Sequence, residues 1–396
     1  MNKFCLLASI LFATTLAEAQ SNLTPEKLWS LGRVSAQGMS ADKKMVYYSV
    51  SIPDINENKS KTKFYEVPLA GGNAKEIAKV PGNEEPKVEQ EGENIKVSPD
   101  GKKVVFTREV KLQAITGMDR YNLPKSNVLV YDNLNQRHWD TWEDGSYAHV
   151  FVADLAGGYA VKEKDIMANE LFDCPQKPHG GAEDLIFTPD SKQVIYVTKK
   201  QSGMAYAIST NTDLYAYSIE QGTTTNLTEG MMGYDTNPAF SEDGKQLAWL
   251  SMKTENCESD KNEVWVMDWS SKEKVNLTAG WDETVASFQW ADDGQKIFFV
   301  APYHGTEQLF EIDIQTQKVK QLTSGQFDVT SIVAQAGNLL VVSRTDMNHA
   351  AELFGVDINT GKFQAITHVN DANYAQINLC KVSERYTELE NGDRVF

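Results

Sequence analysis

The densest group of side chains with binding chemistry in this chain lies between Arg137 and Gly145 and reads Arg-His-Trp-Asp-Thr-Trp-Glu-Asp-Gly. One cation, two indoles and three carboxylates stand there within nine residues. Exposed indoles beside acids can hold an organic cation such as a peptide amino group, through cation–π and charge-assisted contacts. The alternative is a loop attached to the rest of the fold by buried indole rings. The candidate binding residues are Arg137, His138, Trp139, Trp142, Glu143 and Asp144.

Motifs that carry catalysis or bind phosphate are missing from the sequence. No serine has glycine two positions before and after it, so the Gly-x-Ser-x-Gly turn that exposes a hydrolase nucleophile is absent. His-Glu-x-x-His and Gly-x-x-x-x-Gly-Lys are absent as well, and the six histidines are scattered. The Asp292-Asp293 pair lacks the glycine and glutamate of a calcium loop. We therefore expect no catalytic residue, no metal and no cofactor in this chain.

The elements that must position the Arg137–Gly145 segment are repeated. Four segments begin with an apolar residue, end in Leu-Thr or Ile-Thr, and start 50, 45 and 44 residues apart: Leu214–Thr228, Val264–Thr278, Leu309–Thr323 and Leu353–Thr367. Weaker copies begin at Phe64 and Phe151. A period of this length built from short strands is typical of a β-propeller.

A second marker, typified by Ser98-Pro-Asp-Gly-Lys102, stands between these segments and recurs near Ser40, Thr188, Ser241 and Ala291. Asp-Gly pairs suit tight turns, since glycine accepts positive φ and aspartate bonds its own backbone. Short apolar runs follow the markers and predict buried strands: 104–106, 194–197, 247–250, 297–300 and 339–342. The unit is a four-stranded blade, and blades must stack around an axis to bury their apolar faces.

The number of blades depends on the region from Lys111 to Ala148. Six units can be counted, but 87 residues separate Phe64 from Phe151. This region holds either a large insertion or a divergent seventh blade, of which Asn127–Asp132 would be a strand. We favour an all-β propeller of about seven four-stranded blades, with six or eight as alternatives. The segments Ile52–Lys63 and Val80–Asn94 are polar and charged, which favours exposed loops.

The N-terminus has the features of a secretory leader. Lys3 precedes a short apolar run, and Ala17-Glu18-Ala19 fits a small-x-small cleavage site, so we expect a signal peptide over residues 1–19 and a secreted or periplasmic location. Thr24 followed by proline predicts that a short helix opens the mature chain. The formal charge of −17 argues against nucleic acid or anionic membranes as partners.

Cysteine usage does not indicate a disulfide scaffold. Outside the leader, Cys174, Cys257 and Cys380 are widely spaced and odd in number. One disulfide with one free thiol is possible on this count. The loop Cys174–Gly181 reads as a crossing between blades, without a direct functional role.

Several of these segments resemble the prolyl oligopeptidase family of serine peptidases. The opening Leu23–Trp29 with Arg33-Val-Ser looks like the start of that family. The Ser-Pro-Asp-Gly-Lys repeats, the Arg-His-Trp-Asp-Thr-Trp cluster followed by His149-Val-Phe151, and the Cys174–Gly181 loop resemble its dipeptidyl-peptidase 5 and acylaminoacyl-peptidase branch. The likeness runs over nearly the whole chain.

The resemblance implies a propeller over residues 20–380 and the first strands of an α/β-hydrolase domain over 381–396. The family's catalytic serine, aspartate and histidine would then lie beyond Phe396, and we expect this chain alone to be inactive. Its implied role is to gate short peptides and help bind them for the hydrolase, with the Arg137–Asp144 cluster facing substrate. A free-standing propeller that binds a protein or peptide partner is the alternative, a truncated gene copy is a third possibility, and homodimerisation through an exposed apolar face is expected if the hydrolase is missing.

Overall fold

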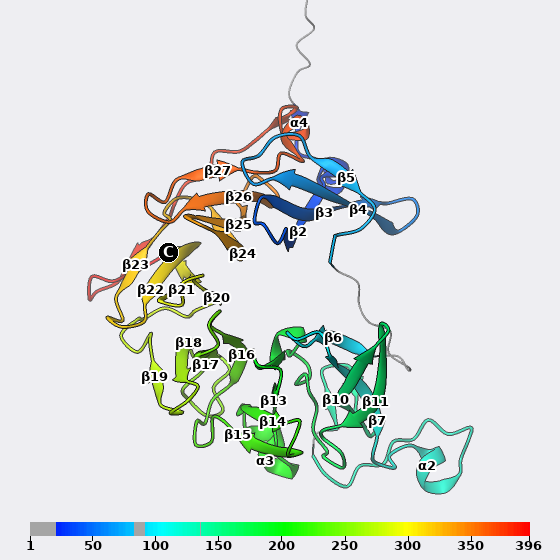
Figure 1. The fold of residues 1–396 in the computed structure, drawn as a ribbon. Coiled ribbons are helices and arrows are strands. Elements are labelled where there is room, and N and C mark those ends of the chain that lie inside the picture. Colours follow the sequence, from blue (N-terminus) through cyan, green and yellow to red (C-terminus); the bar gives the residue numbers. More distant parts are fainter. Residues whose placement is uncertain (1–20, 83–91, 135) are drawn as a thin grey trace, which may run out of the picture.

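The computed structural model describes residues 21–82, 92–134 and 136–396, and these residues form six four-stranded antiparallel sheets arranged as propeller blades (Figure 1). The predicted leader and most of the acidic Val80–Asn94 stretch lie outside the described residues. The expectation of a propeller is confirmed. The favoured number of seven blades is wrong, and six is the number observed.

The first three blades are built as follows. Blade 1 contains β2 (Arg33–Met39), β3 (Met45–Asp54), β4 (Lys59–Pro68) and β5 (Lys75–Ile77). Blade 2 contains β6 (Glu93–Val97), β7 (Lys103–Lys111), β10 (Ser146–Ala156) and β11 (Tyr159–Asp165). Blade 3 contains β12 (Leu185–Phe187), β13 (Gln193–Thr198), β14 (Asp213–Ser218) and β15 (Thr223–Asn226).

The remaining blades follow the same plan. Blade 4 contains β16 (Asp235–Phe240), β17 (Gln246–Ser251), β18 (Glu263–Asp268) and β19 (Lys274–Asn276). Blade 5 contains β20 (Ser287–Trp290), β21 (Lys296–Tyr303), β22 (Thr306–Asp313) and β23 (Val319–Gln321). Blade 6 contains β24 (Asp328–Ala336), β25 (Leu339–Thr345), β26 (Glu352–Asp357) and β27 (Phe363–Ala365).

Short elements lie between and beside the blades. The helices are α1 (Pro25–Ser30), α2 (Gly117–Tyr121), α3 (Gly203–Ile208), α4 (Asp371–Tyr374) and the 3₁₀ turn η1 (Ala182–Asp184). The remaining strands are β1 (Ser21–Asn22), β8 (Arg137–His138), β9 (Thr141–Trp142), β28 (Ile377–Asn378), β29 (Thr387–Glu388) and β30 (Arg394–Val395). The predicted opening helix is confirmed as α1, since the Thr24 hydroxyl accepts the Lys27 N–H at 3.4 Å. No helix within the described ranges has the length and apolar character needed to cross a bilayer.

The repeated threonines have a structural cause. The Thr228 hydroxyl accepts the backbone N–H of Leu214 at 3.1 Å, which ties the end of one blade's fourth strand to the start of its third. The same bond joins Thr278 to Val264 at 2.8 Å. It recurs from Thr323 to Leu309 at 2.9 Å and from Thr367 to Leu353 at 2.8 Å. A buried hydroxyl therefore satisfies a buried amide once in each of these blades.

The turn markers also form one recurring motif. The Ser98 hydroxyl donates to Asp100 at 2.7 Å and accepts the Lys103 N–H at 2.9 Å. The corresponding residues at Ser40, Thr188 and Ser241 make the same two bonds. Each turn fixes the register between the first two strands of its blade.

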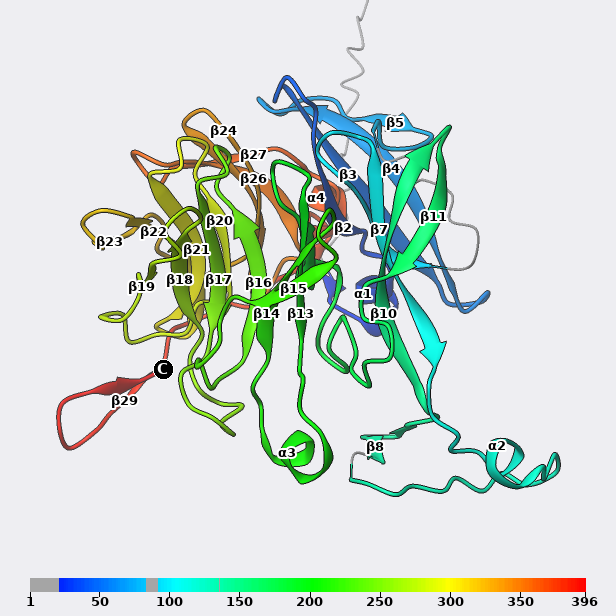
Figure 2. The same cartoon turned by 60° about the horizontal axis from the view of Figure 1, so that its bottom comes forward.

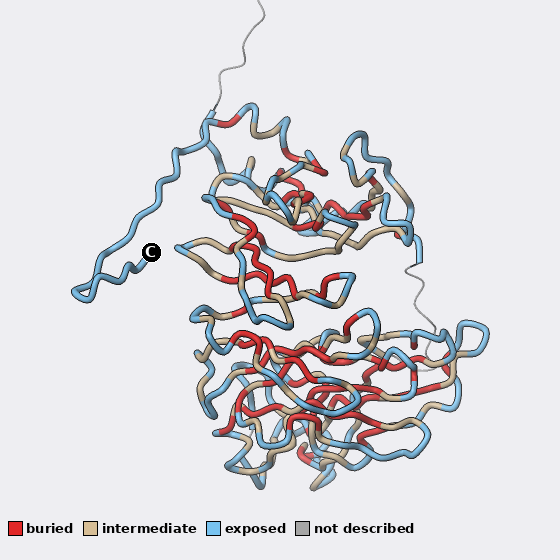
Figure 3. Tube along the Cα trace, turned by 60° about the vertical axis from the view of Figure 1, so that its left-hand side comes forward, coloured by how far each residue is buried: buried red, intermediate tan, exposed pale blue. Residues whose placement is uncertain are grey.

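Buried residues concentrate in the strands of the blades (Figure 3), and the apolar side chains among them pack between successive blades. Five clusters of buried residues join blade 2 to 3, 3 to 4, 4 to 5, 5 to 6, and 6 back to 1. Across the described residues no such cluster joins blade 1 to blade 2, and Figure 1 shows the ring open there. Neighbouring blades therefore hold the ring together at five junctions.

The region predicted to hold a seventh blade is an insertion in blade 2. Strands β7 and β10 pair directly over nine residue pairs, from Lys111 with Ser146 to Lys103 with Asp154. The chain therefore leaves the blade after β7 and returns to the same blade at β10. Of the segment Asn127–Asp132, Leu129 makes an isolated bridge to Thr116 and no blade strand. The predicted Ile52–Lys63 loop is instead the exposed end of the hairpin of β3 and β4, which pair out to Asp54 and Lys59.

Candidate functional site

The insertion between β7 and β10 folds at one end of the ring, beside α3 of blade 3 (Figure 2). Its base is fixed at Gly145, whose carbonyl accepts the backbone N–H groups of Leu112 at 2.9 Å and Gln113 at 3.0 Å. Gly145 has φ +89°, and a Cβ there would stand 2.3 Å from the Gln113 carbonyl oxygen. Only glycine fits this position, so the insertion has a defined point of departure from the blade.

Within the insertion, β8 and β9 form a small hairpin in which Arg137 pairs with Trp142. The Arg137 guanidinium lies 5.4 Å from the centroid of the Trp142 ring and donates to the Trp139 carbonyl at 3.1 Å. Trp139 occupies the hairpin turn with φ +48° and is 70% exposed. A bulky residue at positive φ is uncommon, and such strain gathers at functional sites.

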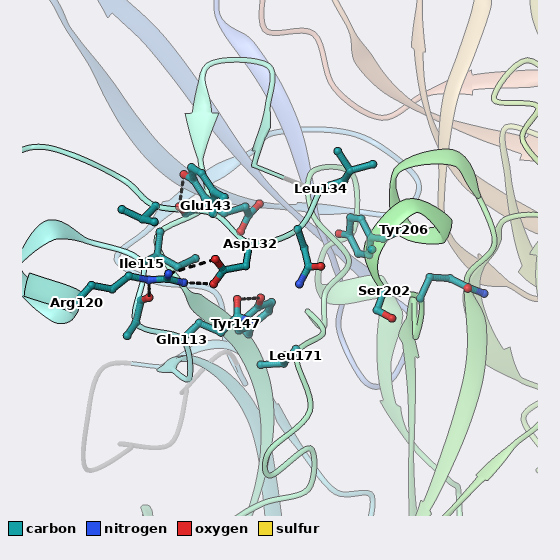
Figure 4. A pocket seen from close by; sticks show the side chains of 16 residues that line it. Gln113, Ile115, Arg120, Asp132, Leu134, Glu143, Tyr147, Leu171, Ser202 and Tyr206 are labelled. Atoms are coloured by element: carbon teal, nitrogen blue, oxygen red, sulfur yellow. Dashed lines mark hydrogen bonds and ion pairs between the residues drawn. The ribbon is translucent and has the colours of Figure 1, made fainter.

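One cavity of about 470 Å³ lies on one side of this hairpin, and we call it the tyrosine pocket (Figure 4). Its lining residues come from the insertion, from β10 and from the α3 region: Gln113, Ala114, Ile115, Arg120, Val130, Tyr131, Asp132, Asn133, Leu134, Glu143, Tyr147, Leu171, Gln201, Ser202, Gly203 and Tyr206. Arg120 and Asp132 form an ion pair within it. Tyr147 donates to the Gln113 side chain at 2.8 Å.

Glu143 is the carboxylate of the tyrosine pocket whose charge is not neutralised. Its backbone carbonyl accepts the Tyr131 hydroxyl at 2.7 Å, but its carboxylate has no hydrogen bond or ion pair to any residue the structure describes. Burial raises the pKa of Glu143, and the negative charge of Asp173 raises it further, against the opposing effect of Lys177. A half-buried, unpaired carboxylate among phenol rings is a suitable acceptor for an ammonium group.

A larger cavity of about 860 Å³ adjoins it, and we call it the tryptophan pocket. Its lining residues are Leu134, Gln136, Arg137, His138, Trp139, Gln176, Lys177, Pro178, His179, Lys199, Tyr206, Ala207, Ile208, Ser209, Thr210, Thr212, Tyr234, Met252 and Glu258. The Trp139 indole contacts two imidazoles, with ring centroids 5.0 Å from His138 and 5.6 Å from His179. Leu134 and Tyr206 line both pockets, so the two cavities are neighbours.

The loop Cys174–Gly181 supplies the floor of the tryptophan pocket. Lys177 bridges Glu109 at 2.9 Å and the buried Asp173 at 3.0 Å, which fixes the loop to blade 2. The Gln176 side chain donates to the Tyr206 hydroxyl at 3.0 Å and accepts the Lys199 N–H at 3.2 Å. This loop, which the sequence did not mark as functional, therefore lines the candidate site.

The six predicted site residues separate into three groups. Arg137, His138 and Trp139 line the tryptophan pocket, and Glu143 lines the tyrosine pocket. Trp142 and Asp144 line neither: Trp142 stacks on Tyr131 with centroids 6.1 Å apart, and Asp144 accepts the Ser146 N–H at 2.8 Å. The alternative of a loop anchored by buried indoles does not hold, since Trp142 is 51% exposed and Trp139 more so.

Several lining residues carried no signal in the sequence. Tyr131 and Tyr147 lie close to the cluster in the chain, but Lys199, Tyr206 and Glu258 come from blades 3 and 4. They lie near the cluster because the blades are neighbours in the ring, and no local sequence pattern indicates this position. Within the described ranges there is no group of three histidine, cysteine or acidic side chains that could hold a metal ion, and Cys174, Cys257 and Cys380 are unpaired.

Comparisons with known proteins agree with this fold. Residues 251–389 match the family model described as the N-terminal region of dipeptidyl peptidase IV. The chain is 31% identical over 411 residues to dipeptidyl-peptidase 5 of Porphyromonas gingivalis and 33% identical over 419 residues to that of Porphyromonas endodontalis. These alignments cover 95% and 97% of this chain and 60% of each relative.

Among solved structures, the acylaminoacyl peptidase of Pyrococcus horikoshii superposes with a TM-score of 0.62 at 13% identity, covering 88% of this chain and 55% of that one. A likeness at this identity shows the fold alone. Fold and sequence together define a β-propeller of the kind carried by peptidases. Within that class the chain is similar to the propeller portion of dipeptidyl-peptidase 5, and it spans about three-fifths of the length of the curated relatives it matches.

Proposed function

We propose that this propeller belongs to a secreted dipeptidyl-peptidase, in which it gates short peptides and binds their free amino group. A hydrolase domain supplies the nucleophilic serine of that enzyme. The unpaired carboxylate of Glu143 in the tyrosine pocket carries the proposal. The names of the relatives support it, because a dipeptidyl peptidase must recognise the amino end of its substrate. The hydrolase itself is part of the proposal and is placed outside these 396 residues.

The electrostatics of the tyrosine pocket favour a cation. Burial is the main cause that raises the pKa of Glu143, and the charges of Asp173, Asp144 and Glu109 raise it further against the opposing effect of Lys177. An ammonium group that binds there neutralises the charge of Glu143 and lies beside Tyr131, Tyr147 and Tyr206. The pocket is small, which suits the first residues of a peptide better than a folded chain.

The position of the site on the ring supports gating. The insertion and α3 stand at the lower end of the ring in Figure 2, and the C-terminal hairpin of β29 and β30 also lies in the lower half of that view. A hydrolase that follows this hairpin would face the two pockets. Peptides that reach it would pass the insertion first.

The test compares peptide binding to this chain by calorimetry, using trialanine and N-acetyl-trialanine. We expect the free amine to bind at least about tenfold tighter, since charge-assisted hydrogen bonds contribute roughly 1.5–3 kcal/mol. Glu143→Gln should abolish this preference, while Glu220→Gln, an exposed carboxylate on blade 3 outside both pockets, should keep it. Equal affinity of the two peptides for the unaltered chain would refute the proposal.

A further inference from the structure

The tryptophan pocket differs from the tyrosine pocket in the sign of its charge. Arg137, Lys199, His138 and His179 supply cationic or N–H donor groups to its wall, and Glu258 is the one carboxylate among its described lining residues. Lys177 also lines it, but two acidic partners already neutralise that side chain. The pocket is therefore suited to a ligand that carries negative charge.

Lys199 is the strongest indication. Its ammonium lies 4.4 Å from the centroid of the Tyr206 ring and makes no ion pair with any described residue. Burial lowers its pKa, and only the more distant, exposed Glu258 opposes that effect. A partly desolvated cation without a direct ion-pair partner gains stability when an anion binds beside it.

The rings around Trp139 supply the rest of a binding wall. The His138 and His179 imidazoles lie edge to face with centroids 6.3 Å apart and contact the Trp139 indole, and neither ring makes a hydrogen bond to a described residue. Their N–H groups are therefore open to a ligand. Trp139, exposed and at positive φ, presents a flat apolar surface to the same cavity.

The two pockets are joined through one hairpin. The Glu143 backbone N–H donates to the Gln136 carbonyl at 3.0 Å, so residues that line opposite pockets are hydrogen-bonded neighbours. Paired strand residues lie about 5 Å apart. A peptide of a few residues, at ~3.3 Å each, can therefore extend from one pocket into the other.

We propose that the tryptophan pocket is a carboxylate subsite, in which Lys199 and Arg137 bind a carboxylate of the same short peptide whose amino group lies at Glu143. This inference rests on the proposed function. It narrows the substrates to short peptides that carry a negative charge at the end opposite the amino group. Two sources of the carboxylate share this chemistry: the C-terminus of the peptide and an acidic side chain.

The experiment measures the affinity of this chain for two peptide pairs by calorimetry at low salt. Tetra-alanine acid against tetra-alanine amide tests the C-terminus, and Ala-Ala-Ala-Glu amide against Ala-Ala-Ala-Gln amide tests the side chain. We expect about tenfold tighter binding of the acid in at least one pair, falling as salt is raised. Either pair supports the subsite and identifies the source. No preference in both pairs overturns it.

Variants separate this subsite from the amine site. Lys199→Met should remove the acid preference, and Glu258→Gln should increase it. Lys272→Met is the matched control, because its ammonium also lies over an aromatic ring, 3.1 Å from the Trp269 ring centroid, on blade 4 outside both pockets. If Lys199→Met fails to fold, Arg137→Gln on the exposed hairpin serves instead. A retained preference for the free amine with no preference for the acid would sink the subsite alone, whereas loss of both would sink the proposed function too.

Discussion

The buried side chain of Asn370 forms two hydrogen bonds with the backbone of Gly32, 338 residues away in sequence. The Gly32 N–H donates to the Asn370 side-chain oxygen at 2.8 Å, and the amide of Asn370 donates back to the Gly32 carbonyl at 2.9 Å. Close by, β1 pairs in parallel with β28. The segments that flank the propeller at its two ends are thus joined by a side chain and a two-residue bridge, while no blade combines strands from both ends of the chain.

Replacing Asn370 by alanine should weaken this junction. The change leaves both polar groups of Gly32 without partners, and each buried unsatisfied group costs about 1–3 kcal/mol. We expect a loss of at least about 2 kcal/mol in the free energy of unfolding, measured by urea denaturation. Asn359→Ala, in an exposed turn of blade 6, is the control and should change little. A variant as stable as the unaltered chain would show that the ends contribute nothing to closure.

Glu143 should give peptide binding a characteristic pH dependence. Its pKa lies above the usual value, chiefly through burial, and the amine-binding form is the carboxylate. Affinity for trialanine should therefore fall as pH decreases through this raised pKa, at a higher pH than for an ordinary glutamate. Calorimetry between pH 4 and 8 measures the profile, and Glu143→Gln should flatten its acidic limb. If Glu143→Gln loses affinity for trialanine over the same acidic pH range, a group other than Glu143 causes the pH dependence.

Asp235 should make the fold less stable at neutral and alkaline pH than at acidic pH. The side chain is buried on β16, where it accepts the Trp249 indole N–H at 3.3 Å while its second oxygen has no partner in the described structure. Burial raises its pKa to about 7. Because the folded-state pKa exceeds the unfolded one, the protonated form favours folding, and this contribution is lost as pH rises from about 4 through 7.

Asp235→Asn removes this titration while keeping the oxygen that accepts from Trp249. We expect the variant to unfold at a higher temperature than the unaltered chain at pH 8 and at a similar temperature at pH 4. The quantity to measure is the difference in unfolding temperature between the variant and the unaltered chain at each pH. Other buried acids titrate in both proteins, such as Asp184, whose pKa burial raises to about 6. A difference in unfolding temperature that does not change with pH would contradict the role given to Asp235.

The repeats made the propeller predictable, because each blade is a local unit. Leu214 and Thr228 belong to one hydrogen-bonded motif, and its recurrence in later blades marks the period. The blade count was harder. The insertion leaves blade 2 at Lys111 and returns to it at Ser146, and its length is similar to that of an extra blade. Only the pairing of β7 with β10 distinguishes an insertion from an additional blade.

The candidate site was only half predictable. The Arg137–Asp144 cluster stood out by composition, and four of its six named residues line a pocket. Lys199 and Tyr206 did not stand out, since a lysine just after a strand and a tyrosine in a short helix have no distinctive pattern. They reach the site because blade 3 lies beside the blade from which the insertion projects, a relation that appears only when the ring forms.

Replacing Trp139 distinguishes most clearly whether the insertion binds peptide or only stabilises the fold. The positive φ of Trp139 costs free energy that glycine would not incur, and its indole is mostly exposed, so Trp139→Gly should leave stability unchanged or raise it by up to about 1 kcal/mol. If the indole contacts bound peptide, the same variant should weaken tetra-alanine binding severalfold. Thermal unfolding and calorimetry on one preparation measure both effects. A clear loss of stability with unchanged affinity would mean that the ring holds the hairpin in place and contacts no ligand.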